Sequence, residues 1–218
     1  MIIDTLGAPS PEGAVVLFDG SSLDGWTSMD GGEPGWALED GAVKVVPKTG
    51  DICTKELFGD HYLHLEFQLS EMPEATGQAK ANSGVFVQGR YEIQVLDSSG
   101  WDLPGVGDCG AVYDQYAPLV NACRSAMEWQ TYDVIFRAPR CEGKVVKERA
   151  RLTVLHNGLV IQNNVELPGV TGAPTDTEVQ LPGHLRLQDH GNVIWFRNIW
   201  AVRLAAEGAR EYSPRMKG

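Results

Sequence analysis

The stretch that decides the fold reads SGVFVQGRYEIQVL and runs from Ser83 to Leu96. Apolar side chains recur at every second position along it: Val85, Val87, Tyr91, Ile93 and Val95. The positions between them carry Gln88, Arg90, Glu92 and Gln94. Because successive side chains of a β-strand point to opposite faces, this period of two predicts a strand with one core face and one hydrogen-bonding face.

Alternation of this kind extends over most of the chain, and no segment keeps an amphipathic helical stripe over three turns. The expected strands cover residues 15–18, 36–39, 42–46, 62–69, 83–96, 129–137, 150–156, 159–166, 183–188 and 194–202. Asn157-Gly158, between two apolar alternating runs, predicts a tight hairpin. The fold class is therefore all-β, a jelly-roll sandwich of two antiparallel sheets.

The length of 218 residues fits one large sandwich or two small domains. The strand pattern favours a single sandwich domain over residues 1–204, followed by a charged C-terminal tail, 205–218, that frays or forms a short helix. Two loops interrupt the pattern. Residues 70–81 read as an exposed excursion, whereas residues 97–128 are long for a loop in a compact domain and are expected to be functional or locally packed.

A net charge of −11, with no dense run among the 18 basic residues, argues against nucleic acid and anionic membranes as partners. A neutral ligand such as a sugar is compatible with this charge. The segment 1–7 has neither a basic start nor a long apolar stretch, so the chain as given is expected to be cytoplasmic; removal of a signal peptide would make it periplasmic or secreted. The spacing of Cys53, Cys109, Cys123 and Cys141 favours free thiols, with Cys109 and Cys123 the most plausible disulfide after export.

Polar faces like that of residues 83–96 recur on residues 62–69 and 183–188. If the three strands are neighbours in one sheet, their polar faces form a single patch of Glu66, Arg90, Glu92, Gln94, Arg186 and Gln188. Carboxylates, amides and guanidinium groups together can satisfy sugar hydroxyls, which both donate and accept. The aromatic residues Trp101, Tyr113, Tyr116 and Trp129 could stack on the sugar. Solvation is the alternative explanation, because a half-exposed sheet turns a polar face to water in any case.

Acid and base candidates for catalysis lie on the same segments. A conventional glycosidase needs two opposed carboxyl groups. Glu92 and Asp97 are the obvious pair, but their spacing places them on opposite faces of a regular strand, so Glu66 is the better partner. His190, at a strand end before a turn, is the preferred acid or base, with a purely structural turn His as the alternative. No local motif predicts a cofactor or a metal site, although a divalent metal is left open.

A series of short motifs gives the chain a family resemblance. In order they are Leu17-Phe18-Asp19-Gly20, Leu23-Asp24-Gly25-Trp26, Asp51-Ile52-Cys53-Thr54-Lys55, Phe58-Gly59-Asp60, Leu65-Glu66-Phe67, Asn82-Ser83-Gly84-Val85, Gly89-Arg90-Tyr91-Glu92-Ile93-Gln94-Val95, Cys109-Gly110-Ala111-Val112-Tyr113, Glu128-Trp129-Gln130-Thr131-Tyr132, His156-Asn157-Gly158, Leu185-Arg186-Leu187-Gln188-Asp189-His190-Gly191 and Phe196-Arg197-Asn198-Ile199-Trp200. This order resembles the 3-keto-disaccharide hydrolase family. The resemblance implies a concanavalin A-like jelly roll and action on sugars oxidised at C3.

A ketone at C3 acidifies the proton on C2, so a base can remove it and the C1 substituent can leave by β-elimination before water adds. On this hypothesis Glu92 and His190 act as base or acid, Arg90 and Gln188 support the enolate, and Glu66, Gln94 and Asn82 orient the substrate. The remaining candidate sugar-binding residues are Asp97, Tyr113, Trp129 and Arg186. A conventional glycoside hydrolase and a non-catalytic carbohydrate-binding domain are the alternatives.

Overall fold

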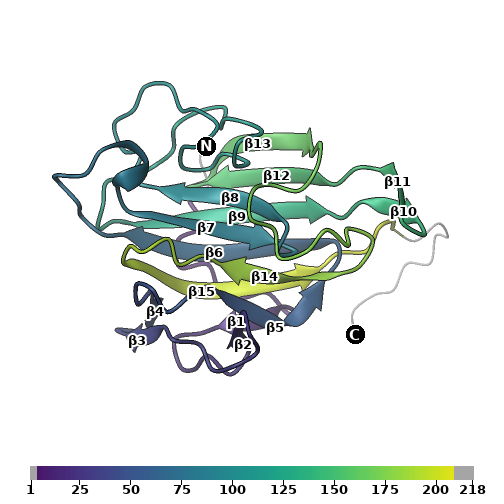
Figure 1. Ribbon diagram of the computed structural model, residues 1–218, viewed down its shortest axis with the longest axis horizontal. Coiled ribbons are helices and arrows are strands. Elements are labelled where there is room, and N and C mark those ends of the chain that lie inside the picture. Colours follow the sequence, from purple (N-terminus) through teal and green to yellow (C-terminus); the bar gives the residue numbers. More distant parts are fainter. Residues whose placement is uncertain (1–3, 209–218) are drawn as a thin grey trace, which may run out of the picture.

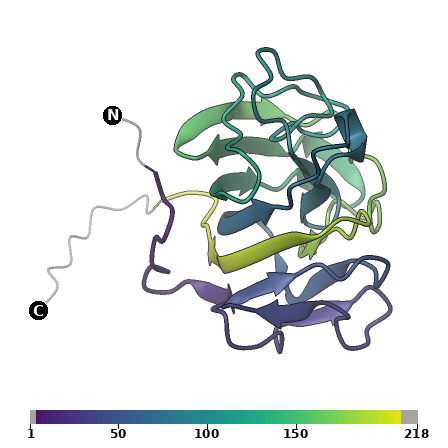
Figure 2. The same ribbon diagram turned by 90° about the vertical axis from the view of Figure 1, so that its left-hand side faces the viewer.

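The computed structural model describes residues 4–208, which form two antiparallel sheets packed face to face (Figure 1). Figure 2 shows the same layers after a 90° turn. The larger sheet has the strand order β13-β12-β9-β6-β15-β4-β3, with β1 also paired to β15, and the smaller sheet has the order β2-β5-β14-β7-β8. The prediction of an all-β jelly-roll sandwich is therefore confirmed.

Each strand lies in the larger sheet, the smaller sheet or a separate two-stranded hairpin. The larger sheet consists of β1 (Val15–Phe18), β3 (Ala37–Glu39), β4 (Ala42–Lys44), β6 (His61–Leu69), β9 (Trp129–Arg137), β12 (Arg151–His156), β13 (Leu159–Glu166) and β15 (Ile194–Arg203). The smaller sheet consists of β2 (Trp26–Ser28), β5 (Ile52–Phe58), β7 (Asn82–Val87), β8 (Tyr91–Leu96) and β14 (Gly183–Leu187). A separate hairpin joins β10 (Arg140–Glu142) to β11 (Val145–Glu148), and a short 3₁₀ turn, η1, covers Gly77–Ala79.

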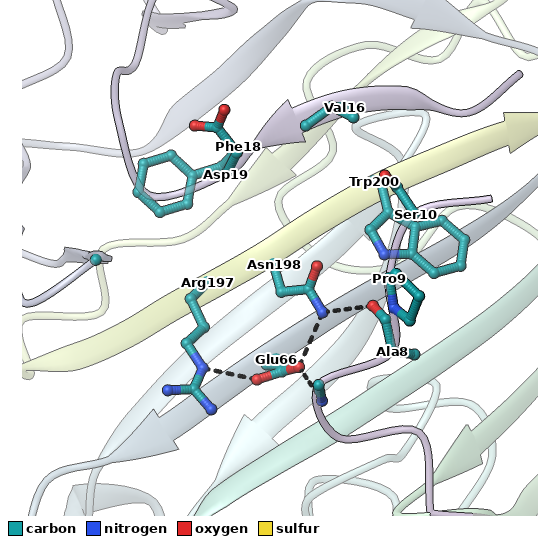
Figure 3. Close-up of a pocket in the computed structure, with 12 residues that line it drawn as sticks. Ala8, Pro9, Ser10, Val16, Phe18, Asp19, Glu66, Arg197, Asn198 and Trp200 are labelled. Atoms are coloured by element: carbon teal, nitrogen blue, oxygen red, sulfur yellow. Dashed lines mark hydrogen bonds and ion pairs between the residues drawn. The ribbon is translucent and has the colours of Figure 1, made fainter. Parts of the chain in front are cut away.

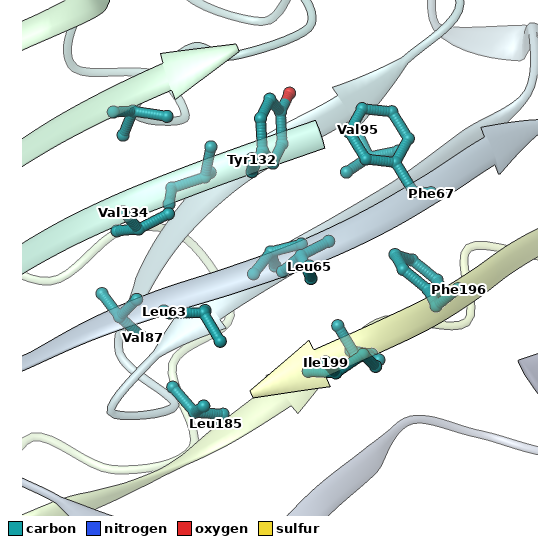
Figure 4. Close-up of a cluster of buried hydrophobic side chains, with 14 of the residues drawn as sticks. Leu63, Leu65, Phe67, Val87, Val95, Tyr132, Val134, Leu185, Phe196 and Ile199 are labelled. Atoms are coloured by element: carbon teal, nitrogen blue, oxygen red, sulfur yellow. The ribbon is translucent and has the colours of Figure 1, made fainter. Parts of the chain in front are cut away.

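The core lies between the two sheets and is built from the inward-facing apolar positions of the alternating strands. Figure 4 shows Leu63, Leu65 and Phe67 of β6 facing side chains of the opposite sheet such as Val87 and Val95. All five of these side chains are buried. Burying an aliphatic or aromatic side chain of this size stabilises a fold by roughly 1.5–3 kcal/mol. The period of two therefore sets which face of each strand meets the other sheet.

The expectation of one strand over residues 83–96 is wrong, because the chain reverses in the middle. Gln88 and Gly89 have φ angles of 53° and 65°, and Val87 pairs with Tyr91 across the turn. Positive φ is the conformation of a tight hairpin turn, and glycine adopts it without strain. The turn takes up three residues, so the odd-numbered residues of β7 and β8 still share the core face. The sequence therefore assigned these side chains to the correct faces, although it did not predict the turn between β7 and β8.

Four strands, β2, β5, β10 and β11, have no counterpart among the expected ones. β5 has the burial order of three buried, three exposed and one buried residue, which lacks the alternation that would reveal it. The other missed strands have three or four residues, too few to show a period. Where an expected strand and an observed strand correspond, apart from the 83–96 hairpin, their bounds differ by at most two residues.

The long segment 97–128 packs on the free edge of β8. The amide of Gln94 donates to the Ala111 carbonyl (3.0 Å), the Gly110 amide donates to the Gln94 carbonyl (2.9 Å), and the Tyr113 amide donates to the Glu92 carbonyl (3.1 Å). An edge strand exposes unpaired backbone groups, and a covering loop satisfies them. This segment therefore completes the smaller sheet and brings Tyr113 next to β8.

The division into one domain over 1–204 and a tail over 205–218 stays a prediction. Residues 205–208 have no regular structure, and residues 209–218 lie outside the described part of the chain. Within residues 4–208 no helix is long and apolar enough to span a membrane. All four cysteines are free thiols in this structure; the Cys109 thiol shares a hydrogen bond with the Tyr132 hydroxyl (3.2 Å), and the Cys123 thiol donates to the Arg124 carbonyl (3.3 Å).

Replacing Phe67 by Ala is expected to lower the free energy of unfolding by about 3–5 kcal/mol, because the cavity cannot collapse between two sheets. Phe67 is fully buried, and its ring packs on Tyr132 with the ring centroids 4.8 Å apart. Urea denaturation followed by circular dichroism measures the change. Val160→Ala, at a side chain that is 45% exposed, is the control and should change stability by less than about 0.5 kcal/mol. Equal losses in the two variants would contradict this account of the core.

Candidate active site

The outer face of the smaller sheet carries a row of polar side chains across three neighbouring strands. Arg186 on β14 pairs with Phe86 on β7, which in turn pairs with Glu92 on β8. One row further on, the Gln188 amide donates to the Gly84 carbonyl (3.0 Å), and Gly84 pairs with Gln94. The pairing of the sheet therefore places Glu92, Gln94 and Gln188 on one surface.

This surface forms the floor of a cavity of about 170 Å³. The cavity is lined by Gln78, Asn82, Glu92, Gln94, Tyr113, Gly172, Ala173, Gln188 and His190. Six of these were among the candidates from the sequence: Asn82, Glu92, Gln94, Tyr113, Gln188 and His190. Pockets for drug-sized ligands have volumes of roughly 300–1,000 Å³, so this cavity suits one sugar ring better than an oligosaccharide.

Glu92 is the buried carboxylate of the cavity. Its side chain is buried, with the residue only 4% exposed, and within residues 4–208 no hydrogen bond to its carboxylate is found. Burial raises the pKa of Glu92 to about 7; the guanidinium of Arg186 opposes this rise, and the carboxylate of Asp51 adds to it. A carboxyl group of this kind can hold or release a proton near neutral pH.

Gly84 creates the space in which the Glu92 carboxyl lies. A Cβ atom on Gly84 would come within 2.3 Å of Oε1 of Glu92. That separation is far below van der Waals contact, so any larger residue at this position would displace the carboxyl group. Gly84 lies within strand β7 and not in a turn, so its role is to leave room for the Glu92 carboxyl in the cavity.

The amide side chains of Gln78, Asn82 and Gln94 also line the cavity and are partly held by one another. Nε2 of Gln94 donates to Oε1 of Gln78 (3.2 Å) and to Oδ1 of Asn82 (3.3 Å), while Nδ2 of Asn82 donates to the Gln78 carbonyl (3.1 Å). Oε1 of Gln188 is buried and has no protein partner. Such amides can donate to and accept from the hydroxyl groups of a sugar. The sequence pattern did not reveal Gln78, because it lies in the short turn η1 rather than on an alternating strand.

His190 lies exposed at the rim, in the turn that follows β14. Asp189 shapes this turn: its backbone amide donates to the Asp51 carboxylate (2.9 Å), and its own carboxylate accepts from the amides of Gly191 (2.9 Å) and Gly50 (3.0 Å). These bonds fix the backbone on either side of His190 and leave the imidazole free to meet a ligand.

Arg90, Arg186 and Asp97 lie beside the cavity and do not line it. Arg90 is buried in the β7–β8 turn and pairs with Asp176 (2.6 Å). The guanidinium of Arg186 covers the Phe86 ring at 3.6 Å, and Asp97 pairs with Lys80 (2.6 Å). Their partners are protein groups, so these three residues are not placed to contact a ligand in the cavity directly.

Glu66 and Trp129 lie on the opposite side of the molecule, so the expectation of one patch over residues 62–69, 83–96 and 183–188 is wrong. β6 pairs with β9 and β15 in the larger sheet, whereas β14 pairs with β5 and β7. The core separates the two outer faces. Alternation defines the two faces of a strand but carries no information about which sheet the strand joins.

The surroundings of Glu66 form a separate cavity of about 360 Å³ (Figure 3). The Glu66 carboxylate accepts hydrogen bonds from Arg197 (2.7 Å), Asn198 (2.9 Å) and the Gly7 amide (2.6 Å). Trp129 packs against the Arg197 guanidinium at 3.9 Å. Both carboxylate oxygens of Glu66 thus have protein donors, and the N-terminal segment is fastened to the larger sheet through them.

Within residues 4–208 no group of three His, Cys, Asp or Glu side chains is arranged to hold a metal ion. The Glu92 cavity contains one carboxylate, one imidazole, a phenol and amides. These groups can together donate to and accept from the hydroxyl groups of a small polar ligand.

Residues 13–202 match the model of the 3-keto-alpha-glucoside-1,2-lyase-like domain. The chain belongs to this family, as the order of its motifs indicated. No curated protein matches the sequence.

Solved structures with the same fold are described as carbohydrate-active. A candidate glycosyl hydrolase from Parabacteroides distasonis is 39% identical, with a TM-score of 0.83 over 90% of this chain and 86% of that one. A second candidate glycosyl hydrolase from that organism is 20% identical, with a TM-score of 0.65 over 89% and 95% of the two chains. A variant of the alginate lyase Aly36B is 10% identical, with a TM-score of 0.51 over 91% and 100%, and shares the fold alone.

Replacing Glu92 by Gln is expected to stabilise the protein at pH 8 and to change its stability little at pH 4. In the folded state the pKa of Glu92 is about 7, above the ordinary value of 4.5. Between pH 4.5 and pH 7 the folded protein therefore binds more protons than the unfolded protein, and the stability of the wild-type protein falls as the pH rises through this range. The two pKa values differ by about 2.5, so the difference at pH 8 should be on the order of 3 kcal/mol. Urea denaturation at both pH values measures it. Glu148→Gln, at an exposed ion pair, is the control, and identical behaviour of the two variants would contradict the raised pKa.

Proposed function

We propose that the protein cleaves the glycosidic bond of 3-keto glycosides or 3-keto disaccharides by β-elimination followed by hydration. The observation that supports this function best is Glu92, a buried carboxyl group without a hydrogen-bond partner among residues 4–208, at the floor of a cavity that His190 and several amides also line. The family to which the chain belongs is consistent with a 3-keto substrate.

The reaction needs one base, one acid and support for an oxyanion. Glu92 as carboxylate takes the proton from C2 of the sugar, and the electron pair of the C–H bond moves toward the C3 ketone to give an enolate. The enolate then expels the C1 substituent, whose oxygen receives a proton from His190, and leaves a C1–C2 double bond. Water adds to that bond, its proton returning to C2 and its hydroxyl to C1. The net result is hydrolysis without oxidation or reduction.

The amides of the cavity are the candidates for supporting the enolate. Gln188 and Gln94 flank Gly84 on the floor, and Asn82 lies at the start of β7. Fixed amide donors can stabilise a developing negative charge without reorganisation. Arg90, the other candidate for this role, pairs with Asp176 outside the cavity, so we assign enolate support to the amides.

A conventional glycoside hydrolase is the first alternative. Retaining and inverting enzymes need two carboxyl groups on either side of the scissile bond. Glu92 is the only carboxyl residue among those that line the cavity in the described chain. This composition favours chemistry that uses a single carboxylate and an imidazole.

A non-catalytic carbohydrate-binding domain is the second alternative. Amides and Tyr113 would suit such a domain equally well, but an unpaired buried carboxyl group would not, since neutral groups bind hydroxyls at a lower desolvation cost. Glu92 therefore favours an enzyme over a binding domain.

A matched pair of substrates tests the proposal. The wild-type protein should cleave a 3-keto glucoside and leave the parent glucoside intact, with and without a chelator, because elimination requires the ketone. Glu92→Gln should lower kcat by roughly 10²- to 10⁴-fold, since it removes the base. Glu148→Gln, on β11, should keep wild-type activity. Equal rates on both substrates would support the conventional hydrolase, and binding without turnover would support the binding domain.

A further inference from the structure

A segment between β13 and β14 covers the edge of β8 next to Glu92. We call residues 171–176 the strap. The Thr171 amide donates to the Arg90 carbonyl (3.0 Å), and the Glu92 amide donates to the Thr171 hydroxyl (2.9 Å). Further along, the Thr175 amide donates to the Gly89 carbonyl (2.8 Å). The strap thus extends the hydrogen bonding of the smaller sheet beyond its last strand.

Two arginines hold the strap, one at Asp176 and one at Ala173. Nε of Arg90 pairs with Oδ1 of Asp176 (2.6 Å), and Arg90 itself is only 2% exposed. On the other side, Nη2 of Arg186 donates to the Ala173 carbonyl (2.7 Å). The guanidinium of Arg186 is itself held flat on the Phe86 ring. Both arginines therefore reach the strap from fixed positions on the sheet.

The part of the strap next to the Ala173 attachment is a wall of the cavity. Gly172 and Ala173 both line it, and Ala173 has a φ angle of 51°. This conformation is unfavourable for alanine by about 1 kcal/mol and persists only where surrounding contacts enforce it. The hydrogen bond from Arg186 to the Ala173 carbonyl is such a contact.

We propose that Arg90 and Arg186 are positioning residues, which hold the strap against β8 so that it excludes water from Glu92 and prepares this group for proton transfer. The consequence for turnover rests on the proposed function; the exclusion of water does not. When the strap is released, water should reach the Glu92 carboxyl and stabilise its charged form.

Within residues 4–208 four ionisable groups surround Glu92, and each comes from a different segment of the chain. They are Arg186 on β14, Asp51 before β5, Tyr113 in the segment beside β8 and His190 in the turn after β14. Asp176, at the far end of the strap, is not among the charges that act on Glu92. A change at Asp176 therefore reaches Glu92 through the position of the strap.

Asp176→Asn is the main test, because it removes the ion pair with Arg90 and keeps the shape of the side chain. The ¹³C resonance of the Glu92 carboxyl, assigned with Glu92→Gln, should titrate at least about one pH unit lower than in the wild-type protein, in which the pKa is about 7. Hydrogen exchange of the Thr171 and Thr175 amides should accelerate about tenfold or more. On a 3-keto glucoside, the acid limb of kcat/KM should move down by the same interval as the Glu92 titration.

Arg186→Lys is the second variant, for use also if Asp176→Asn does not fold. It keeps a positive charge beside Glu92 but lacks the planar fork that reaches the Ala173 carbonyl, so the same changes are expected. Glu148→Gln, at the exposed Arg137 pair, should leave titration and exchange as in the wild-type protein.

An unchanged Glu92 titration in a folded strap variant would overturn the proposal. Absence of turnover in every protein, including wild type, would refute the proposed function alone, because titration and exchange still report on the strap.

Discussion

The site is built on the burial of Tyr91, Ile93 and Val95 in the core between the two sheets. Alternation along β8 then forces Glu92 and Gln94 to the outer face together. Pairing with β7 and β14 brings Gly84 and Gln188 beside them, and this assembles the floor of the cavity. The apolar half of each strand thus decides where its polar half can act.

The buried glutamates on the two outer faces of the sandwich, Glu66 and Glu92, have pKa values shifted in opposite directions. Burial raises the pKa of both carboxyl groups, but at Glu66 the interaction with His64, whose Nε2 lies 3.8 Å away, and the hydrogen bonds from Asn198 and Arg197 outweigh it and hold the pKa at about 2. Among residues 4–208 no hydrogen-bond donor reaches the Glu92 carboxylate, and the pKa of Glu92 stays at about 7. A carboxylate with satisfied oxygens stabilises the structure, whereas one with free oxygens near neutral pKa is suited to chemistry. Glu66 accordingly fastens the N-terminal segment, and Glu92 faces the cavity.

An unpaired buried carboxyl group costs stability, and the surrounding fold must offset that cost. The offset comes from both loops along the edge of β8. Residues 110–113 satisfy the backbone of Glu92 and Gln94 on one side, and the strap satisfies the backbone of Arg90 and Glu92 on the other. These loops also supply Tyr113, Gly172 and Ala173 to the cavity wall. The same two loops therefore cover the edge of β8 and enclose the cavity.

The fold class, the faces of the long strands and the family could be read from the sequence, because a period of two and an ordered series of motifs are local properties. The same local pattern indicated Glu92, Gln94, Gln188 and His190, which follow from strand faces and a turn. Which strands share a sheet depends on tertiary packing: Glu66 alternates as Glu92 does, yet its strand joins the opposite sheet. Tertiary structure likewise decided that Arg90 meets Asp176, 86 residues away, and that Gln78 and Ala173 enter the cavity. Contacts between distant segments depend on how whole sheets pack, and no local period encodes that packing.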